Sequence, residues 1–209
     1  MRLRIASAAD SAALLAIYGQ YIETTITFEY ALPDVQEFAA RITGTLAGYP
    51  WLVCEEDGRI LGYAYAHRAQ ARAAYQWNAE LSVYLDRACT GRGLGPVLYR
   101  ALIALLTMQG VRTVYGCVTR PNPPSEAMHR QMGFTRLGVF HKAGYKCGAW
   151  HDVTWFEKEI APHTDAPVPP TPFPALPREQ VEDVLSTLAE KKKNCYPFIY
   201  KEKQGGEFQ

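Results

Sequence analysis

The residues between 82 and 110 are the stretch of this chain best suited to bind a phosphate group. A strand there leads into the turn Gly91-Arg92-Gly93-Leu94-Gly95, and the turn opens onto a long amphipathic helix. Glycines lack a Cβ atom, so their backbone can adopt positive φ and approach a ligand closely. The helix adds unpaired N–H groups and the positive end of its dipole. The pattern predicts an anion-binding turn, with an ordinary tight turn as the alternative.

The spacing of these glycines excludes the two common nucleotide-binding motifs. A dinucleotide fingerprint requires G-x-G-x-x-G, but Pro96 and Leu98 stand where its last glycine would be. A P-loop requires G-x-x-x-x-G-K-[ST], and the sequence contains no such run. The predicted phosphate ligand is therefore of another kind.

Two titratable residues near the turn could transfer protons. Glu80 lies on the strand before it, where Ser82 should share its side while Leu81 and Val83 face the other way. A carboxylate with a pKa of about 4.3 is a poor base at pH 7, so Glu80 needs partial burial or a relay through water. His129 titrates near neutrality without tuning. The alternatives are a solvated carboxylate and a structural histidine.

Hydrophobic periodicity predicts the elements that position these residues. In chain order we expect a strand at 3–6, helices from about residue 10 and at 34–46, strands at 51–55, 60–66 and 77–85, a helix at 92–109, a strand at 111–118, a helix at 122–132, and a terminal hairpin of strands 134–143 and 150–158 around 144–149. Asp57-Gly58 is a strong hairpin signal. This order predicts an α/β fold with helices on both faces of a mixed sheet.

The composition changes abruptly after Ile160. Seven prolines fall within residues 161–177, which predicts a stiff linker or a strap lying on the domain. Val181, Val184, Leu185 and Leu188 then recur at helical spacing. We expect a domain at 1–160, a proline-rich linker at 161–177, and an amphipathic helix and tail at 178–209.

Charge and cysteine content restrict the function classes. The chain has 209 residues, 48% of them hydrophobic, and a formal net charge of +1, which provides no basic field for nucleic acid. Its five cysteines form no C-x-x-C pair, so we expect a reducing compartment, no metal and no disulfide framework. No run resembles a signal peptide or approaches the roughly 20 apolar residues of a membrane span. We expect a cytoplasmic protein.

Several motifs in this order resemble the GNAT superfamily of N-acetyltransferases, and its phosphinothricin and methionine sulfoximine branch in particular. They are YIET at 21–24 with Phe28, YPWLV at 49–53, AELSVYL at 79–85, GLG at 93–95 with Leu98 and Tyr99, NP at 122–123 with Ser125 and His129, AGYK at 143–146, and WHDV at 150–153. The resemblance covers about residues 2–160. It implies the acyl-CoA N-acyltransferase fold, in which the sheet is mostly antiparallel and one strand pair splays apart to bind acetyl-CoA.

The resemblance also implies which residues contact acetyl-CoA. Val83, Tyr84 and Leu85 would pair with the pantetheine arm, the N–H groups from Gly91 to Pro96 would hold the pyrophosphate, and Asn122 would contact the cofactor or simply cap its helix. These cofactor-binding candidates are Val83, Tyr84, Leu85, Gly91, Arg92, Gly93, Leu94, Gly95, Pro96 and Asn122. Thr90 stands where the superfamily has Gln or Arg, a loss for which Arg92 could compensate.

The implied catalytic residues are Glu80 as the base, His129 as a second candidate, and Tyr99. Tyr99 would protonate the departing thiolate or orient the acceptor. Phe28, Arg72 and Tyr75 are the implied substrate-binding residues, and Gln70 replaces an expected lysine, which argues against a strongly anionic head group. The implied protein is a homodimer that acetylates a small amino acid or analogue, an activity associated with herbicide or antibiotic resistance. The alternatives are a non-catalytic acetyl-CoA sensor and a protein or peptide acetyltransferase.

Overall fold

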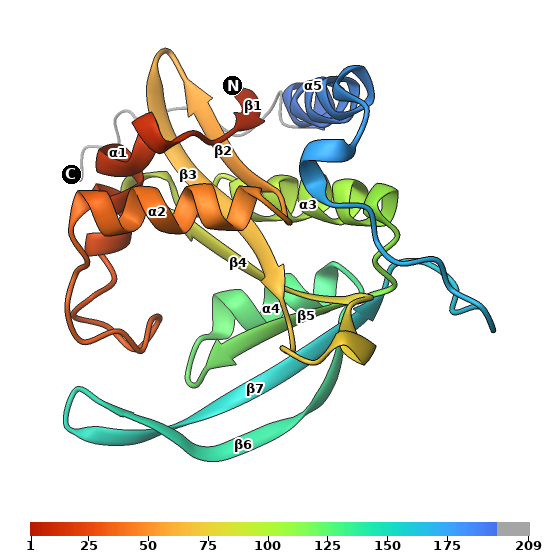
Figure 1. Cartoon of the computed structure of the whole chain (residues 1–209). Coiled ribbons are helices and arrows are strands. Elements are labelled where there is room, and N and C mark those ends of the chain that lie inside the picture. Colours follow the sequence, from red (N-terminus) through yellow and green to blue (C-terminus); the bar gives the residue numbers. More distant parts are fainter. Residues whose placement is uncertain (196–209) are drawn as a thin grey trace, which may run out of the picture.

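The structure is a computed structural model that describes residues 1–195, with side chains to residue 191. One seven-stranded sheet has the strand order β1-β2-β3-β4-β5-β7-β6 (Figure 1). Every neighbouring pair is antiparallel except β4 and β5, which run parallel. The predicted mixed, mostly antiparallel sheet is confirmed. Residues 196–209 of the predicted tail lie outside the described part of the chain.

The first half of the chain supplies one edge of the sheet and the helices of one face. Its elements are β1 (Arg2–Ile5), η1 (Ala8–Asp10), α1 (Ser11–Gly19), α2 (Val35–Leu46), β2 (Trp51–Glu56) and β3 (Arg59–Arg68). The Asp34 side chain accepts a hydrogen bond from the Glu37 N–H and so caps the start of α2. Asp57 and Gly58 have φ of 51° and 77°, values typical of a type I′ turn that matches the strand twist.

The second half supplies the centre of the sheet and a long terminal hairpin. Its elements are η2 (Ala73–Tyr75), β4 (Asn78–Leu85), η3 (Arg87–Cys89), α3 (Leu94–Gln109), β5 (Thr113–Thr119), α4 (Pro123–Gln131), β6 (Thr135–Lys146), β7 (Ala149–Glu159), η4 (Phe173–Ala175) and α5 (Arg178–Cys195). Gly110 ends α3 in the left-handed region, with φ of 92°.

Alternation along the strands divides the core between the two faces of the sheet. Trp51, Val53 and Tyr63 are buried in a cluster with α1 and α2, whereas Leu52 and Ala64 are buried in a cluster with α3 and α5. Figure 1 shows α1 and α2 on one side of the sheet and α3 and α5 on the other. Helices therefore cover both faces of β4, the strand at the centre of the sheet.

The parallel pair β4 and β5 separates halfway along β4. Their register runs from Asn78 opposite Thr113 to Leu81 opposite Gly116 and then stops. Beyond Leu81, β4 continues to pair with β3 as far as Leu85, and β5 continues to pair with β7 as far as Thr119. Each strand turns an edge without a strand partner toward the gap. The splayed pair expected from the resemblance is present.

The terminal hairpin is longer than the sequence pattern indicates. We expected a loop over residues 144–149, but β6 and β7 pair up to Lys146 and Ala149. The turn consists of Cys147 and Gly148, both with positive φ. A cysteine at the first turn position is an unusual residue for a type I′ turn. Gly144 by itself predicts the end of a strand, although it pairs with His151 within β6.

The segment after β7 lies on the domain. The Gln109 side-chain amide donates to the carbonyl oxygens of Gly48 and Thr171, both at 2.8 Å. Helix α5 contacts α3 and β1, and its Val181 and Leu185 side chains are buried. The described part of the extension is thus tied to the loop before β2 and to α3.

Candidate active site

The gap between β4 and β5 holds a small cavity that gathers most of the predicted chemistry. The cavity has a volume of about 80 Å³. It is lined by the candidates Glu80, Val83, Tyr84, Tyr99, Asn122 and His129, and by Ile26, Leu81, Ser82, Cys117, Val118, Thr119 and Ser125. Residues from a loop, two strands and two helices meet here because the strand separation removes the backbone that would otherwise fill the space.

Glu80 is half-buried at the point where the strands part. Its register partner on β3 is His67, and the His67 Nε2 atom lies 4.0 Å from Glu80 Oε1. Burial raises the pKa of the Glu80 carboxyl above its ordinary value, and the nearby His67 opposes that rise. A carboxylate with a raised pKa holds a proton more readily, which is what a base needs.

Tyr99 and His129 form a buried pair on the α3 face of the sheet. The Tyr99 hydroxyl donates to the Leu81 carbonyl at 3.2 Å and lies 3.5 Å from His129 Nε2. The Nδ1 atom of His129 lies 2.8 Å from the Ser125 carbonyl, so Nδ1 carries the hydrogen and Nε2 is the free acceptor. Burial raises the pKa of Tyr99 and lowers that of His129. Both groups are neutral near pH 7.

A glycine on β5 creates the space for this histidine. A Cβ atom at Gly116 would lie 2.2 Å from His129 Nε2, which no real pair of atoms tolerates. The His129 ring also stacks on Phe156 with centroids 5.0 Å apart and meets Phe134 edge-on. His129 is 2% exposed. Its fixed position favours orienting Tyr99 over exchanging protons with solvent.

The glycine turn leads directly from the cavity to the start of α3. Gly91 and Gly93 have φ of 74° and 72°, in the left-handed region that favours glycine. A Cβ atom at Gly91 would meet no atom within 4 Å, so open space lies beside the turn. The first N–H groups of α3 have no carbonyl within their own helix. These features fit the pyrophosphate of an acyl-CoA, with the free edge of β4 available for its arm.

Arg92 has a different environment from the one expected for a phosphate contact. Its guanidinium forms an ion pair with Glu56 at 2.7 Å and also contacts the Cys89 sulfur. The Thr90 hydroxyl donates to the Arg87 carbonyl at 2.9 Å. The Asn122 side chain accepts from the Ser125 N–H at 3.3 Å and caps α4, while it also lines the cavity. The cap is therefore present, and the position of Asn122 in the lining leaves the predicted cofactor contact sterically open.

Sequence reasoning did not select Cys117, Thr119 and Ser125, although all three line the cavity. Cys117 and Thr119 alternate with the buried Val118 along β5, so the strand pattern alone could have placed them on the face shared with Glu80. Ser125 carries no such signal. Its carbonyl holds His129, a contact that follows from one turn of helix α4.

None of the three substrate-binding candidates lines the cavity in the gap. Phe28 packs against Gly144 of β6, where a Cβ atom would approach its ring to 2.4 Å. Arg72 is exposed at the start of η2. Tyr75 is 45% exposed and lines a separate cavity with Tyr115, Phe140 and other residues. The structure therefore does not bring these three residues together with Glu80.

A larger, aromatic cavity opens on the same face of the sheet as Glu80. It has a volume of about 470 Å³ and lies between α2 and the strands β2 and β3. The lining residues are Tyr18, Glu29, Phe38, Arg41, Gly44, Thr45, Tyr49, Trp51, Tyr63, Tyr65 and His67. We call it the aromatic cavity. His67 connects it to Glu80.

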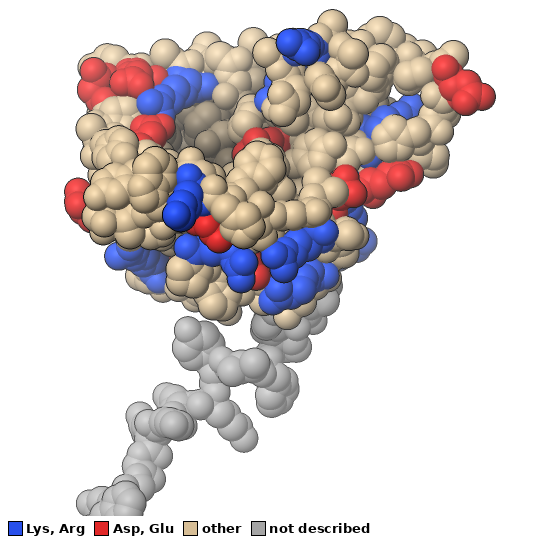
Figure 2. Space-filling view, turned by 90° about the horizontal axis from the view of Figure 1, so that it is seen from below, with Lys and Arg blue, Asp and Glu red and all other residues tan. Residues whose placement is uncertain are grey.

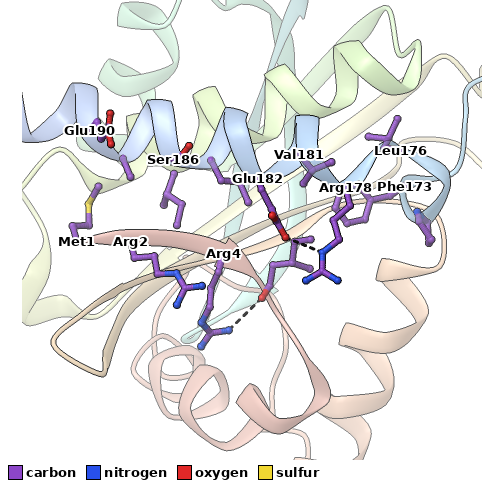
Figure 3. Close-up of a pocket in the computed structure, with 15 residues that line it drawn as sticks. Met1, Arg2, Arg4, Phe173, Leu176, Arg178, Val181, Glu182, Ser186 and Glu190 are labelled. Carbon is purple, nitrogen blue, oxygen red and sulfur yellow. Dashed lines mark hydrogen bonds and ion pairs between the residues drawn. The ribbon is translucent and has the colours of Figure 1, made fainter.

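A further cavity, larger than the two described above, lies away from this chemistry. It measures about 820 Å³ and separates β1 from α5 at the edge of the sheet (Figure 3). The Arg178 and Glu182 side chains that line it form an ion pair with each other, and Arg4 donates to the Ile5 carbonyl. No candidate catalytic or cofactor-binding residue lines it, so we do not assign the reaction to this groove.

Figure 2, seen from below the view of Figure 1, shows Lys and Arg gathered along one border of a face whose middle is largely uncharged and hollowed. Within residues 1–195, no helix is long and apolar enough to cross a membrane.

Comparison with known proteins agrees with this geometry. The family model described as an acetyltransferase (GNAT) domain matches residues 3–155. The chain is 38% identical over 173 residues to phosphinothricin N-acetyltransferase of Streptomyces viridochromogenes, covering 82% of this chain and 92% of that protein. It is 32% identical to L-methionine sulfoximine/L-methionine sulfone acetyltransferase of Pseudomonas aeruginosa, covering 79% and 98%.

A solved structure shows the same fold with its cosubstrate. The phosphinothricin acetyltransferase of Sinorhizobium meliloti in complex with acetyl-CoA is 31% identical, with a TM-score of 0.75, and the match covers 82% of this chain and 97% of that one. The chain belongs to the GNAT family of acetyltransferases.

Proposed function

We propose that this protein transfers the acetyl group of acetyl-CoA to the amino group of a small amino acid or analogue, of the phosphinothricin, methionine sulfoximine or methionine sulfone type. The observation that carries the proposal is the cavity in the gap between β4 and β5, which both Glu80 and Tyr99 line. The glycine turn leads from this cavity to the start of α3. The names of the two relatives support the acceptor class.

Glu80 acts as the base. An amino acid arrives as an ammonium with a pKa well above 7, and only the neutral amine can attack the thioester carbonyl. The raised pKa of Glu80 suits it to accept that proton, directly or through water. The neutral amine then attacks the acetyl carbon and the carbon–sulfur bond breaks. The nitrogen loses its second proton in this step, and through water that proton replaces the one which the departing thiolate takes up.

Tyr99 protonates the departing thiolate. Its buried hydroxyl remains neutral near pH 7 because burial raises its pKa, so a proton is available on the oxygen. The Leu81 carbonyl accepts its hydrogen at 3.2 Å, and His129 Nε2 lies 3.5 Å from the same oxygen as the alternative acceptor. His129 is thus a positioning residue for Tyr99. Glu80 and Tyr99 approach the gap from opposite faces of β4, which keeps the base and the acid apart.

The acetyl-CoA path uses the free edge of β4 and the N-terminus of α3. Val83, Tyr84 and Leu85 offer backbone groups to the pantetheine arm, and the N–H groups of Gly91 to Gly95 receive the pyrophosphate. Pro96 lacks an N–H, a small loss in the first helical turn. Arg92 contributes least, because Glu56 already pairs with it.

Arg72 and Tyr75 supply the outer part of the acceptor site. An exposed guanidinium can form a two-pronged pair with the acceptor carboxylate, and Tyr75 adds a ring and a hydroxyl. Phe28 closes the side next to the hairpin.

Two assembly features complete the proposal. Residues 1–160 form the catalytic unit, and 161–195 form a strap and helix that pack on it.

The protein is a homodimer, for which the exposed side chains of Leu137, Phe140, Tyr145 and Trp150 on the β6–β7 hairpin provide an apolar surface. Sedimentation of the wild type and of Phe140→Glu tests this: loss of the dimer in the variant is expected, and a monomeric wild type would contradict it.

Thiol release from acetyl-CoA, measured against a panel of free amino acids, phosphinothricin, methionine sulfone and peptides, tests the proposed reaction. We expect turnover with free amino acids and their analogues. Tight acetyl-CoA binding without turnover on any amine would instead identify a sensor, and turnover on peptides alone would identify a protein acetyltransferase.

A further inference from the structure

We propose that the aromatic cavity receives the side chain of the acceptor, and that the preferred acceptor is an α-amino acid with a large apolar side chain, aromatic ones first. This inference rests on the proposed acetyl transfer and names the acceptor of that same site. It assigns a role to the cavity between α2 and the strands β2 and β3, which the acetyl-CoA path does not use.

The position of the aromatic cavity relative to Glu80 suits an amino acid. Tyr63, Tyr65 and His67 alternate along β3 and point to one face, and their partners on β4 are Tyr84, Ser82 and Glu80. Glu80 thus lies on the face where the aromatic cavity opens. Neighbouring strands are about 4.8 Å apart, so a molecule with its amine at Glu80 reaches the rings of the neighbouring strand β3 with a side chain of benzyl length.

The walls of the cavity are preformed. The rings of Trp51 and Tyr65 stack with centroids 4.2 Å apart, and Trp51 also stacks on Tyr63 at 5.7 Å. Phe38 of α2 meets Trp51 edge-on. Trp51, Tyr63 and Phe38 are each no more than 3% exposed, so neighbouring atoms fix their orientation. A rigid, ring-lined pocket favours flat apolar groups, which lose little entropy on binding.

The charges at the cavity argue against an anionic side chain. Arg41 contributes a guanidinium to the lining, but two nitrogens of that guanidinium already pair with Glu29 and Glu37, each at 2.6 Å. Of these charged groups only Glu29 and Arg41 line the cavity, so the lining offers an anion no unpaired guanidinium. A phosphinate placed here would lose its water without gaining a free cation, whereas an apolar side chain would cover the partly exposed rings of Tyr49 and Tyr65 without a charge penalty.

The cavity that contains Tyr75 is the competing location for the acceptor side chain. It also measures about 470 Å³ and also opens on the face of Glu80, through Asn78 and Tyr115. Its outer wall includes Gln70 and Tyr75, both exposed side chains outside the proposed dimer surface. Because an exposed wall offers a ligand less enclosure than the stacked rings of the aromatic cavity, we assign the side chain to the aromatic cavity.

Two glycines allow the two cavities to be filled one at a time. Gly44 lines the aromatic cavity and Gly138 lines the other, and a Cβ atom at either position would meet nothing within 4 Å. Leucine is a better helix former than glycine, so Gly44→Leu is compatible with α2. The experiment measures kcat/KM of full-length wild type, Gly44→Leu and Gly138→Leu for phenylalanine, alanine and phosphinothricin at saturating acetyl-CoA.

For the wild type we expect kcat/KM for phenylalanine to exceed that for alanine and for phosphinothricin by about tenfold or more, the scale of a filled apolar pocket. Gly44→Leu should lower the value for phenylalanine about tenfold and leave that for alanine unchanged. Gly138→Leu should change neither. A selective loss in Gly138→Leu alone, or an equal loss for both amino acids in Gly44→Leu, would overturn the assignment.

Calorimetric titration with N-acetylphenylalanine separates this inference from the proposed reaction. If no amine is acetylated, the proposed reaction fails, yet the cavity still predicts binding that Gly44→Leu weakens about tenfold. Equal binding to the wild type and Gly44→Leu, or no binding to either, would refute the role of the cavity. Circular dichroism of each variant confirms that it is folded.

Discussion

The proposed acetyl-CoA side of the gap and the proposed acceptor side are assembled in different ways. The acetyl-CoA side consists of β4, the glycine turn and α3, which follow one another from Asn78 to Gln109. The acceptor side combines the loop at 20–34, β3 and the tip of the β6–β7 hairpin, which lie far apart in the chain. A contiguous segment can be recognised by its motif, whereas the second group depends on contacts across the molecule.

The contacts that hold the acceptor side are specific. The buried Lys146 ammonium donates to the Thr27 carbonyl at 2.6 Å, and the Tyr18 hydroxyl shares a hydrogen bond with the Thr27 hydroxyl at 2.6 Å. Tyr30 donates to the Tyr145 carbonyl. The loop at 20–34 is thereby fastened to β6, and the ring of Phe28 comes to rest over Gly144.

The largest effect is expected at the acetyl-CoA side, from Gly93→Val. A β-branched residue is strained at φ of 72°, by about 1–2 kcal/mol. Its side chain also obstructs hydrogen bonds to a charged phosphate, each worth about 1.5–3 kcal/mol. Acetyl-CoA affinity, measured by calorimetry, should fall more than about 10²-fold.

Gly58→Val is the matched control for that strain. Gly58 has φ of 77° but lies in the β2–β3 turn, away from the gap. It should lose stability without losing acetyl-CoA affinity. Normal affinity in Gly93→Val would remove the turn from the phosphate site.

Glu80→Gln should leave acetyl-CoA affinity unchanged and lower kcat about 10²-fold, the usual scale for an acid–base group. Burial raises the pKa of Glu80, so the base is lost as the pH falls through that raised value. The wild-type rate should therefore decrease on the acid side, and that decrease should be absent in the glutamine variant. Stopped-flow rates across pH measure both. An identical acid limb in the two proteins would exclude Glu80 as the base.

Lys146→Met should affect the acceptor side alone. Removing the ammonium leaves the buried Thr27 carbonyl without its donor, at a cost of about 1–3 kcal/mol. The loop that carries Phe28 should loosen, raising KM for the acceptor about tenfold while KM for acetyl-CoA stays constant. Steady-state kinetics with each substrate varied distinguishes the two. Lys142→Met, at an exposed position on the same strand, serves as the control. An equal rise in both KM values would show that the two sides are not independent.

The smallest effect on catalysis is expected from Leu185→Ala in α5. Leu185 is 4% exposed in the core cluster shared with α3, and its truncation should lower the free energy of unfolding by about 2–5 kcal/mol. Both KM values should be unchanged at a temperature where the protein is folded. Urea unfolding measures the loss, with the exposed Ser186→Ala as control. Unaltered stability would mean that the helix is not part of the cooperative unit.

Prediction from sequence succeeded where one segment contained the whole signal. The glycine turn, the hairpin at Asp57-Gly58 and the alternation of Glu80 with Leu81 depend on backbone rules that act over a few residues. The extent of β6 and β7 was misjudged, because Gly144 indicates a break when read alone. Its missing Cβ instead provides space for Phe28, a residue more than a hundred positions away.

The sequence by itself determined the mixed sheet, the glycine turn and the place of Glu80 on the strand before it, because periodicity and glycine spacing encode local geometry directly. Only the tertiary structure decided that Arg92 pairs with Glu56, that His129 is enclosed beside Gly116, and that stacked rings from β2 and β3 leave a cavity next to Glu80. Each of these depends on which distant side chains compete for the same space or charge. Such competition is settled when the chain packs, and no local pattern records its outcome.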